Sequence, residues 1–385
     1  MNADIIVINW NGRQQTLECL ESVSAQLQEV TGGAMITVVD NGSTDGSIGA
    51  IRNSYPAIRF LPLGRNTGFT GGVAAGVARS PARNVIFLNN DAVPQKGWLA
   101  ALVQAIEAAP DDVVSVGGKI VSMDGRTIDF IGGAMTFDGH AFQNGFRYAT
   151  GSQAEPKSGE ELLFACGGNM ITRRERFLSL GGFDDDYFAY LEDVDFGWRT
   201  WISGGRVTFE PAALVRHHSS ATSDRLGSFE RGVLFERNAL QTALKNFEDV
   251  REAGSSVLFA YLHRLHHYAT TRNGDAAELT RPFGTKRKGI GGLRRKALVT
   301  IDDPLTAMQF RALDWVMKNA PRVAAKRTAV QGSRTRTDDE IFARFPLHFV
   351  PTYPGDEAML RNPLFALLRP TLPTVDKTLG EIMRT

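Results

Sequence analysis

The stretch Ile5-Ile6-Val7-Ile8-Asn9-Trp10-Asn11-Gly12 decides the fold, because a run of four β-branched apolar residues stops abruptly at polar and turn-forming ones. Continuous apolar runs of this kind are typical of strands buried on both faces, as in parallel sheets. Three further short strands are predicted at Ile36–Val39, Ile58–Leu61 and Val85–Leu88. Helical patterns alternate with them, at residues 14–28, 47–53, 70–79 and 97–108. Residues 1–112 therefore predict βαβ units and a doubly wound, Rossmann-like α/β sheet.

Polar clusters follow three of these strands, at Asn9–Gly12, Asp40–Asp45 and Asn89–Asp91. Doubly wound sheets bind ligands in the crevice beyond the carboxyl ends of their strands, so these clusters mark the expected binding edge. An Asp at a strand end accepts hydrogen bonds from a base or a ribose, and the Asn, Gly and Ser residues after it expose backbone N–H groups. The alternative for residues 40–47 is an Asx turn that caps the next helix, with Asp45 as N-cap.

Two more clusters suit a phosphorylated ligand. Glycines in the segment Asn66–Gly72 allow a backbone to approach a diphosphate closely, although a tightly packed helix start explains them equally well. Asn89-Asn90-Asp91 places a carboxylate at the end of a core strand. Hard cations such as Mg²⁺ and Mn²⁺ prefer oxygen ligands and commonly bind one or two carboxylates plus substrate phosphates. We therefore favour a metal at Asp91 over a simple strand-ending turn.

The segment Gly181–Arg199 carries six acids in twelve positions, interleaved with aromatic residues. Such an aromatic stretch does not suit a solvated helix face, and an acid among aromatics can have a tuned pKa and act as a general base. On a helix Glu192 and Asp195 share a face, whereas Asp193 points elsewhere, so one acid is expected to face a pocket. Further along, His217 and His218 end an apolar run as metal ligands or as a polar strand terminus.

Beyond residue 112 the pattern changes. Paired glycines interrupt short strands over residues 113–248, which predicts a mixed-sheet half that shapes the pocket of a second substrate, with a helix at 228–248. Residues 249–385 read as a helix-rich, locally basic region. Within it, residues 281–300 carry seven basic side chains and no acid. This segment is either a solvated loop or a peripheral contact with anionic lipid, at on the order of 1 kcal/mol per basic residue.

Composition limits the classes of protein. The formal net charge of the 385 residues is +1, which disfavours a nucleic-acid binder. The two cysteines, Cys19 and Cys166, give neither a metal spacing nor a disulfide framework and fit a reducing compartment. The first residues lack the basic start and long apolar run of a secretion signal. We expect a cytoplasmic protein, at most peripheral on the inner face of the cell membrane.

In this order the clusters resemble the inverting glycosyltransferases of family 2, which have the GT-A fold. The resemblance spans residues 3–248. It rests on short motifs in register, which are Val7–Asn11, Val38–Asp45, Asn66–Gly68, Leu88–Asp91, Gly182–Asp184, Glu192–Asp195 and His217. The rhamnosyltransferases of O-antigen and cell-wall polysaccharide assembly form the most similar subgroup. The resemblance implies a GT-A nucleotide-sugar-binding domain over residues 1–248 with a mixed central sheet, divided into a nucleotide-binding half (1–112) and an acceptor and catalytic half (113–248).

Carried over position by position, the resemblance implies specific roles. The nucleotide would be bound by Asn9, Asn11, Asp40, Asn41, Asn66, Gly68, Asn89 and Asn90, with Arg237 at the diphosphate. Asp91 matches the last acid of the family's Asp-x-Asp metal motif, whose first acid is Asn89 here. His217 matches a family metal ligand, and the neighbouring His218 leaves the register open by one residue. Asp193, the second acid of the Glu-Asp pair, matches the catalytic base.

The expected activity is transfer of a sugar, with rhamnose from dTDP-rhamnose as the leading candidate, to a hydroxyl of a glycan or lipid-linked acceptor. A dTDP- or UDP-sugar would be the donor and Mg²⁺ or Mn²⁺ the cofactor. One base activates the hydroxyl, and the metal neutralises the departing diphosphate. The alternatives are a sugar nucleotidyltransferase, although residues 9–13 lack the glycine-rich phosphate loop of that class, and a non-catalytic glycan-binding scaffold, which the intact Asp91, Asp193 and His217 disfavour.

Overall fold

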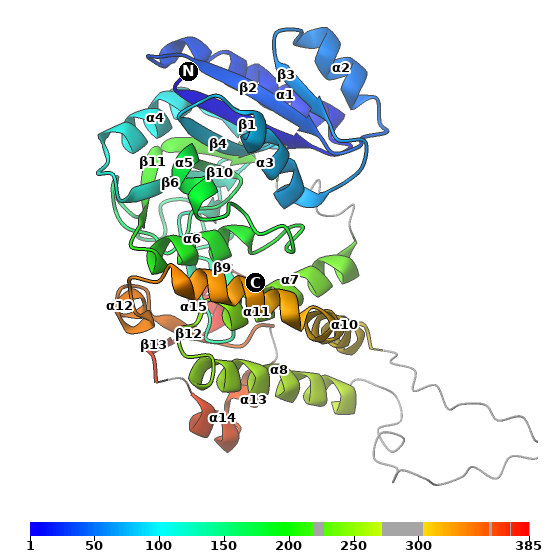
Figure 1. Ribbon diagram of the computed structural model, residues 1–385, viewed down its shortest axis with the longest axis vertical. Helices are drawn as coiled ribbons and strands as arrows, with labels where there is room; N and C mark the ends of the chain where they lie inside the picture. Colours follow the sequence, from blue (N-terminus) through cyan, green and yellow to red (C-terminus); the bar gives the residue numbers. More distant parts are fainter. Residues whose placement is uncertain (219–226, 272–302, 354–355, 370, 385) are drawn as a thin grey trace, which may run out of the picture.

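The computed structural model describes residues 1–218, 227–271, 303–353, 356–369 and 371–384. A mixed sheet forms the upper part of the molecule in Figure 1, and a layer of helices from the second half of the chain lies beneath it. The basic segment 281–300 lies outside the described residues, so its contact with a membrane stays a prediction. Within the described part, no helix combines the length and the apolar character needed to cross a bilayer.

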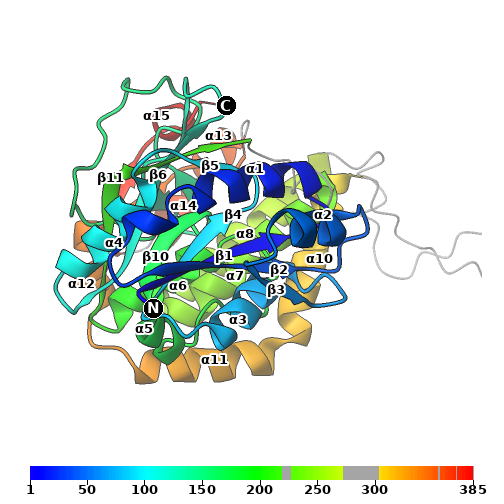
Figure 2. The ribbon, with the colours of Figure 1, turned by 90° about the horizontal axis from the view of Figure 1, so that it is seen from above.

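Four parallel strands start the sheet. They are β1 (Ala3–Asn9), β2 (Ala34–Asp40), β3 (Arg59–Pro62) and β4 (Asn84–Asn89), and β5 (Ala92–Pro94) follows directly. Between them run α1 (Arg13–Ser24), the short 3₁₀ helix η1 (Leu27–Glu29), α2 (Ser47–Ser54) and α3 (Gly68–Arg79), and α4 (Trp98–Ala108) comes after β5. Each predicted strand and helix of residues 1–112 is confirmed within a few residues. The helices α1 and α2 cover one face of the sheet and α3 covers the other (Figure 2).

Two glycines let α3 pack closely on the sheet. A Cβ at Gly72 would lie 2.8 Å from the Ile8 side chain, and one at Gly76 would lie 2.7 Å from Ile6. A Cβ at either position would be too close to these isoleucines. Gly72 and Gly76 therefore allow α3 to pack closely on β1. This contact fixes the start of α3, and with it the turn at Gly68, beside the carboxyl end of β1.

The second half adds strands in both directions. They are β6 (Val113–Ser122), β7 (Ile128–Phe130), β8 (Gly133–Met135), β9 (Ala141–Gln143), β10 (Asn169–Arg173) and β11 (Arg206–His217), with helices α5 (Arg174–Ser179), α6 (Glu192–Ile202) and α7 (Ser228–Asn246). The sheet order is β3-β2-β1-β4-β10-β6-β11-β5, with β7 paired to β6. Because β10 runs antiparallel to both β4 and β6, the predicted mixed sheet is confirmed. Strands β8 and β9 form a separate hairpin.

The remaining elements are α8 (Glu252–Thr271), α10 (Pro304–Lys318), α11 (Ala320–Gly332), α12 (Asp338–Arg344), β12 (Leu347–Phe349), α13 (Glu357–Leu360), α14 (Pro363–Leu368), β13 (Thr374–Asp376) and α15 (Leu379–Ile382). The predicted domain boundary at residue 248 falls between α7 and α8. Helices α10 and α11 pack along α7, and the chain then returns to the middle of the molecule near β9 (Figure 1).

A buried ion cluster joins this helical layer to the β8–β9 hairpin. His140 Nδ1 lies 3.1 Å from Asp138 Oδ1, and its Nε2 lies 3.4 Å from Glu236 Oε2 on α7. Arg264 of α8 pairs with both carboxylates, each at 3.2 Å. Burial alone would lower the pKa of His140, but the charges of Asp138 and Glu236 raise it to about 9. The two cations therefore balance the two anions at neutral pH.

We expect the free energy of unfolding to fall as the pH rises above neutrality. Folding raises the pKa of His140 above its ordinary value of 6.5, so the protonated ring stabilises the fold fully below that value and the contribution is lost as the pH rises through about 9. The pKa of His217 is also raised, so both histidines contribute to the slope measured by urea unfolding. The share of His140 is at most about 1.4 kcal/mol per pH unit. His140→Gln should remove that share and His266→Gln, on the exposed side of α8, should keep the full slope; equal slopes in both variants would refute the assignment.

Candidate functional site

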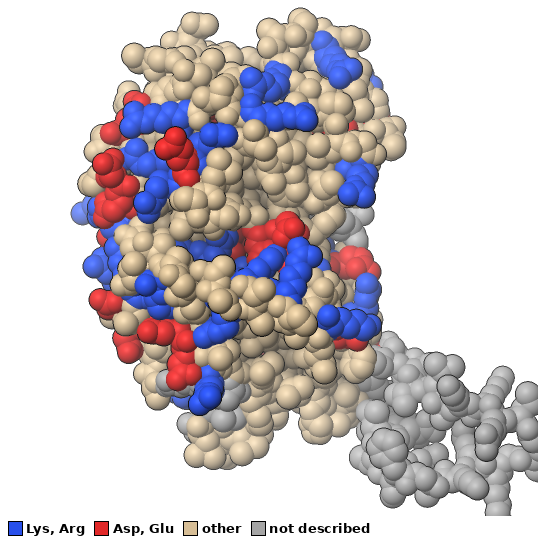
Figure 3. Space-filling view, viewed as in Figure 1, with Lys and Arg blue, Asp and Glu red and all other residues tan. Residues whose placement is uncertain are grey.

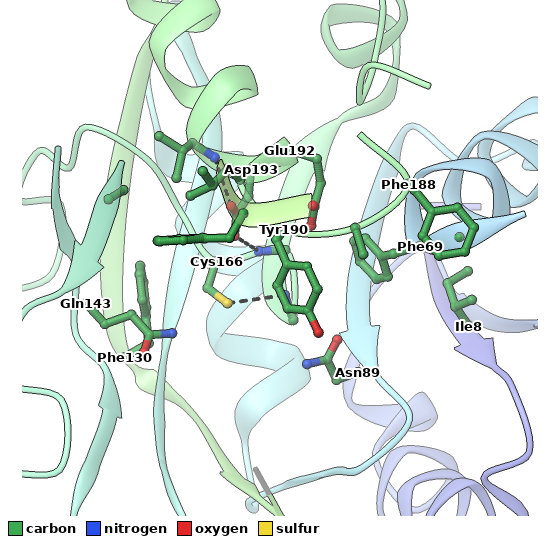
Figure 4. A pocket seen from close by; sticks show the side chains of 18 of the residues that line it. Ile8, Phe69, Asn89, Phe130, Gln143, Cys166, Phe188, Tyr190, Glu192 and Asp193 are labelled. Carbon is green, nitrogen blue, oxygen red and sulfur yellow. Dashed lines mark hydrogen bonds between the residues drawn. The ribbon is translucent and has the colours of Figure 1, made fainter. Parts of the chain in front are cut away.

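A cavity of about 490 Å³ opens beyond the carboxyl ends of β1, β4 and β11, at the edge of the sheet that the polar clusters indicated. Figure 4 shows its walls. On one side lie Ile8, Phe69 and Phe188, and on the other lie Phe130 and Gln143. Tyr190, Glu192 and Asp193 project between them, opposite Asn89. Eight of the predicted site residues line this cavity, namely Asn41, Asn66, Gly68, Asn89, Asn90, Asp91, Asp193 and His217.

The register of β5 against β11 brings His217 to Asp91. These strands pair antiparallel with His217 opposite Ala92, the residue that follows Asp91. His217 Nε2 lies 3.0 Å from Asp91 Oδ1, while His217 Nδ1 lies 2.6 Å from Asp129 Oδ2 on β7. The neighbouring His218 is paired with Glu18 at 3.1 Å, and it does not line the cavity. The geometry thus favours His217 of the two histidines.

The electrostatics of this trio follow from burial and pairing. Burial alone would lower the pKa of His217, but its hydrogen bonds to Asp129 and Asp91 raise it to about 10. Burial would raise the pKa of Asp91, yet the hydrogen bond and charge of His217 hold it below its ordinary value. A carboxylate and an imidazole whose second nitrogen is held by another carboxylate form the arrangement that orients metal-binding histidines. The donor set of Asp91 and His217 therefore fits a divalent cation.

A second group of acids also offers possible ligands for a metal ion. Oxygens of Asp184, Asp185 and Asp186 lie close enough together to hold a cation. Lys326 of α11 already contacts all three carboxylates, at 2.9 Å from Asp185 and 2.6 Å from Asp186, and Lys245 lies 2.7 Å from Asp184. Figure 3 shows acidic side chains directly against basic ones near the middle of this face. Arg322 of α11 pairs with Asp186 at 2.8 Å, so three basic side chains face the three acids, and we assign the group to packing between the turn before α6 and α11.

The acids of α6 have three different environments. Asp193 lines the cavity and accepts hydrogen bonds from the N–H groups of Gly167 (3.0 Å) and Val194 (2.8 Å). Burial raises the pKa of Asp193. Burial and then the charge of Asp193 raise the pKa of Glu192 well above its ordinary value. Asp195 lies outside the cavity lining, paired with Arg199 and Lys245, both at 2.8 Å.

Glu192 and Asp195 were predicted to share one face of a helix, with Asp193 on another, and this prediction was wrong. Glu192 and Asp193 both line the cavity, while Asp195 lies in the ion network beneath it. The reason is that Glu192 is the first residue of α6, where side chains extend past the end of the helix, so the face rule of a helix interior does not hold there.

The turn before α6 has an unusual backbone. Phe188, Tyr190 and Leu191 have φ values of 63°, 72° and 62°, in the left-handed region that costs a non-glycine residue on the order of 1–3 kcal/mol. The side chain of Asn238 on α7 holds this turn. Its Nδ2 donates to the carbonyls of Tyr187 (3.1 Å), Ala189 (2.9 Å) and Tyr190 (2.7 Å). Because the turn is held in this conformation, Glu192 and Asp193, which follow it, line the cavity.

Arg237 also holds the turn before α6. Its Nη2 donates to the carbonyls of Asp186 (2.6 Å) and Tyr187 (2.8 Å), and its guanidinium stacks 4.5 Å from the ring centre of Trp315. It does not line the cavity, so the predicted contact with a diphosphate has no support in this geometry. The donor groups of Arg237 point instead at the backbone of the turn that carries the catalytic candidates.

Asn9, Asn11 and Asp40 also stand apart from the cavity lining. Asn9 Nδ2 donates to Asp40 Oδ1 at 2.8 Å, and the other Asp40 oxygen accepts from the N–H of Ser43 at 2.9 Å. Asn11 Oδ1 accepts from the N–H of Thr44 at 2.7 Å. These hydrogen bonds tie the end of β1 to the end of β2 and the residues that follow it. Their predicted contact with base and ribose stays untested.

Several residues that line or support the cavity had no predicted role. Asp129 had a weak signal, a single acid between the apolar Ile128 and Phe130. Trp10 belongs to the motif Val7–Asn11, but no role was predicted for it. Met383 lies far from any motif. The support from Asn238 had no local signal, because its partners lie about 50 positions away.

The chain is similar in sequence to known glycosyltransferases. A family model described as "Glycosyl transferase family 2" matches residues 4–180. The chain is 31% identical over 214 residues to the N-acetylglucosaminyl-diphospho-decaprenol L-rhamnosyltransferase of Mycobacterium tuberculosis, an alignment that covers 49% of this chain and 68% of that protein. It is 34% identical over 149 residues to the O-antigen biosynthesis protein RfbC of Myxococcus xanthus, covering 36% of this chain and 11% of that protein.

Among solved structures, GalNAc-T7 with UDP, GalNAc and Mn²⁺ superposes with a TM-score of 0.50 at 16% identity. The match covers 72% of this chain and 53% of that one. At this identity the likeness concerns the fold, and it supports the predicted GT-A architecture with its mixed sheet and helical C-terminal region.

The three hydrogen bonds of Asn238 lead to a prediction. Asn238→Ala should lower the free energy of unfolding by roughly 1–3 kcal/mol, because the part-buried carbonyls of Ala189 and Tyr190 lose their side-chain donor. Amide hydrogen exchange, followed by mass spectrometry, should accelerate over residues 187–194 and stay unchanged in β1 and β4. Asn319→Ala, which removes a donor to the Trp315 carbonyl on α10, is the matched control. Unchanged exchange over residues 187–194 in Asn238→Ala would show that the turn holds itself.

Proposed function

This chain belongs to glycosyl transferase family 2 and is a nucleotide-sugar glycosyltransferase, and we propose that it moves rhamnose from dTDP-rhamnose to a hydroxyl of a lipid-linked saccharide. Membership of the family favours glycosyl transfer over a nucleotidyltransferase or a scaffold. The observation that carries the proposal is the single cavity in which a base candidate, Asp193, faces a metal-binding pair, Asp91 and His217. The rhamnosyl donor and the diphosphate-lipid acceptor rest on the mycobacterial relative, whose name states both an L-rhamnosyl transfer and a decaprenol diphosphate.

Asp193 is proposed as the general base. Its two backbone hydrogen bonds hold the carboxylate in place, and its raised pKa makes it a stronger acceptor of a proton. The acceptor hydroxyl loses its proton to Asp193 as its oxygen bonds to the anomeric carbon. The bond from that carbon to the diphosphate breaks, and the diphosphate leaves with the electron pair. Attack opposite the leaving group inverts the anomeric centre. A positioned base contributes typically 10²–10⁴-fold to such a step.

The donor nucleotide is placed against the wall built from β1 and α3. Ile8, Trp10, Asn66 and Gly68 line that side, and Asn41 holds the turn at Gly68 through a hydrogen bond of 2.8 Å to its carbonyl. Asp91 and His217 would hold Mg²⁺ or Mn²⁺, and mixed oxygen and imidazole ligation suits Mn²⁺ somewhat better. When bound, the cation would neutralise charge on the departing diphosphate. A role in cell-wall or O-antigen assembly, at the inner face of the cell membrane, would follow from such an acceptor.

The base is tested with dTDP-rhamnose and a short-chain N-acetylglucosaminyl diphosphate lipid, by nucleotide release. Asp193→Asn should lower kcat at least about 10²-fold, with donor binding by calorimetry little changed. Glu192→Gln preserves a neutral hydrogen-bonding group at the neighbouring position and should keep most of the turnover. If Asp193→Asn is nearly as active as the wild type, or if Glu192→Gln is the more damaged variant, the assignment is wrong.

The metal pair is tested by binding as well as by turnover. EDTA should abolish transfer, and Mn²⁺ or Mg²⁺ should restore it. Asp129→Asn should lower Mn²⁺ affinity about 10–100-fold, because the His217 ring loses the carboxylate that orients it. Electron paramagnetic resonance of Mn²⁺ with dTDP present measures this directly. Asp124→Asn, on the exposed turn before β7, serves as the control. Full activity in chelator would reject the metal, and unchanged Mn²⁺ binding in Asp129→Asn would reject the orienting role.

A further inference from the structure

The wall of the cavity opposite the β1 and α3 side is built mainly from apolar side chains. Phe142 of β9, Phe146 just after it, Phe235 of α7 and Met383 all line the cavity while remaining partly exposed. Phe130 and Phe164 lie behind them with almost no exposure. Gln143 supplies a polar group beside Phe130 (Figure 4). A partly exposed aromatic surface inside a pocket is suited to a ligand with one apolar face.

This wall depends on the last described residues of the chain. The N–H of Gly145 donates to the Ile382 carbonyl at 2.8 Å, and the N–H of Arg384 donates to the Phe146 carbonyl at 2.8 Å. Phe146 and Met383 thereby form a parallel bridge. On the other side of the β8–β9 hairpin, the N–H of Phe137 donates to the His348 carbonyl at 3.2 Å. The hairpin is therefore held on both sides by residues 347–384.

These residues lie beyond the part of the chain that the family model matches, which ends at residue 180. A segment remote from the shared domain thus supplies one side chain of the cavity, Met383, and fixes the loop that carries two others, Phe142 and Phe146. Side chains that complete a pocket from such a segment are in a position to set what the pocket accepts.

We propose that residues 379–384 complete the acceptor site, where Phe142, Phe146 and Met383 receive the less polar face of the acceptor's sugar ring. The proposal rests on the proposed function. Asp193 has to reach the acceptor hydroxyl, and the donor lies against the β1 and α3 wall, so the acceptor enters from the other side. A pyranose presents C–H groups on one face and hydroxyls at its rim. The three side chains cover that face, and Gln143 lies where a rim hydroxyl would need a hydrogen-bond partner.

The contact is tested with the same short-chain N-acetylglucosaminyl diphosphate lipid as acceptor. Phe146→Ala and Met383→Ala should each raise the acceptor KM about tenfold, while the dTDP dissociation constant stays at its wild-type value. Phe310→Ala and Met317→Ala, at exposed positions of α10, are the matched controls. In saturation-transfer NMR, irradiation of the aromatic protons should reach the ring C–H protons of the acceptor in the wild type and weaken in Phe146→Ala.

The role of the segment is tested separately by Arg384→Pro. This change removes the N–H that donates to the Phe146 carbonyl and leaves Met383 in place. Met383 already has an extended backbone, with φ of −149° and ψ of 155°, which suits a residue before proline. The acceptor KM should rise as in Phe146→Ala. Arg384→Ala keeps the backbone hydrogen bond and should behave like the wild type.

The outcomes separate this inference from the proposed function. An acceptor KM within about twofold of the controls in both alanine variants overturns it, and so does an equal loss of dTDP affinity, which would assign the wall to the donor. If the wild type hydrolyses dTDP-rhamnose but transfers nothing to the lipid, the proposed acceptor is wrong; saturation transfer from the aromatic protons to methyl N-acetylglucosaminide then decides the wall alone. Absence of that transfer in the wild type would overturn the inference.

Discussion

The antiparallel pairing of β5 with β11 is the contact on which the site depends. It sets His217 beside Asp91, residues that lie far apart in the sequence, and the N–H of His218 donates to the Asp91 carbonyl at 3.0 Å. Side chains alternate between the two faces of a strand, so a slip of one residue would turn His217 away and bring His218 in its place. Strand β6 pairs with both β11 and β7, and Asp129 of β7 holds the second nitrogen of the His217 ring.

The opposite half of the site depends on α7. Asn238 and Arg237 donate hydrogen bonds to the carbonyls of a turn whose backbone is strained at three positions. Asp193, which follows this turn, lines the cavity. Strain of this kind persists only where the surroundings determine the conformation. Beneath the turn, Lys245 of α7 pairs with Asp184 and Asp195, so the acids that the site does not use are neutralised by the same helix. Helix α7 therefore positions the turn and shares the charge balance with Arg199 of α6 and Lys326 of α11.

Local patterns were sufficient for the first half of the fold and insufficient for much of the site. The strands β1 to β4 and the helices between them follow from runs and spacings within about ten residues, so the sequence predicted them well. The resemblance assigned roles to Asp91, His217 and Asp193, and all three residues line one cavity. It failed to anticipate where Arg237 points, because that depends on how α7 lies against a turn 50 positions earlier. Asp129 and Met383 became evident only when distant segments were brought together.

The bridge between Phe146 and Met383 also bears on the order in which the molecule assembles. Strands β1, β2 and β4 pair within the first 90 residues, whereas this bridge joins Phe146 to Met383. Closing a long loop costs more entropy than closing a short one, and contacts of large sequence separation slow folding. On the ribosome, the side of the cavity built from β1 and α3 can therefore form well before the wall that contains Met383 has been synthesised. A nascent chain passes through a stage in which the cavity has only one of its two walls, and the contact of Phe146 with Met383 completes it late.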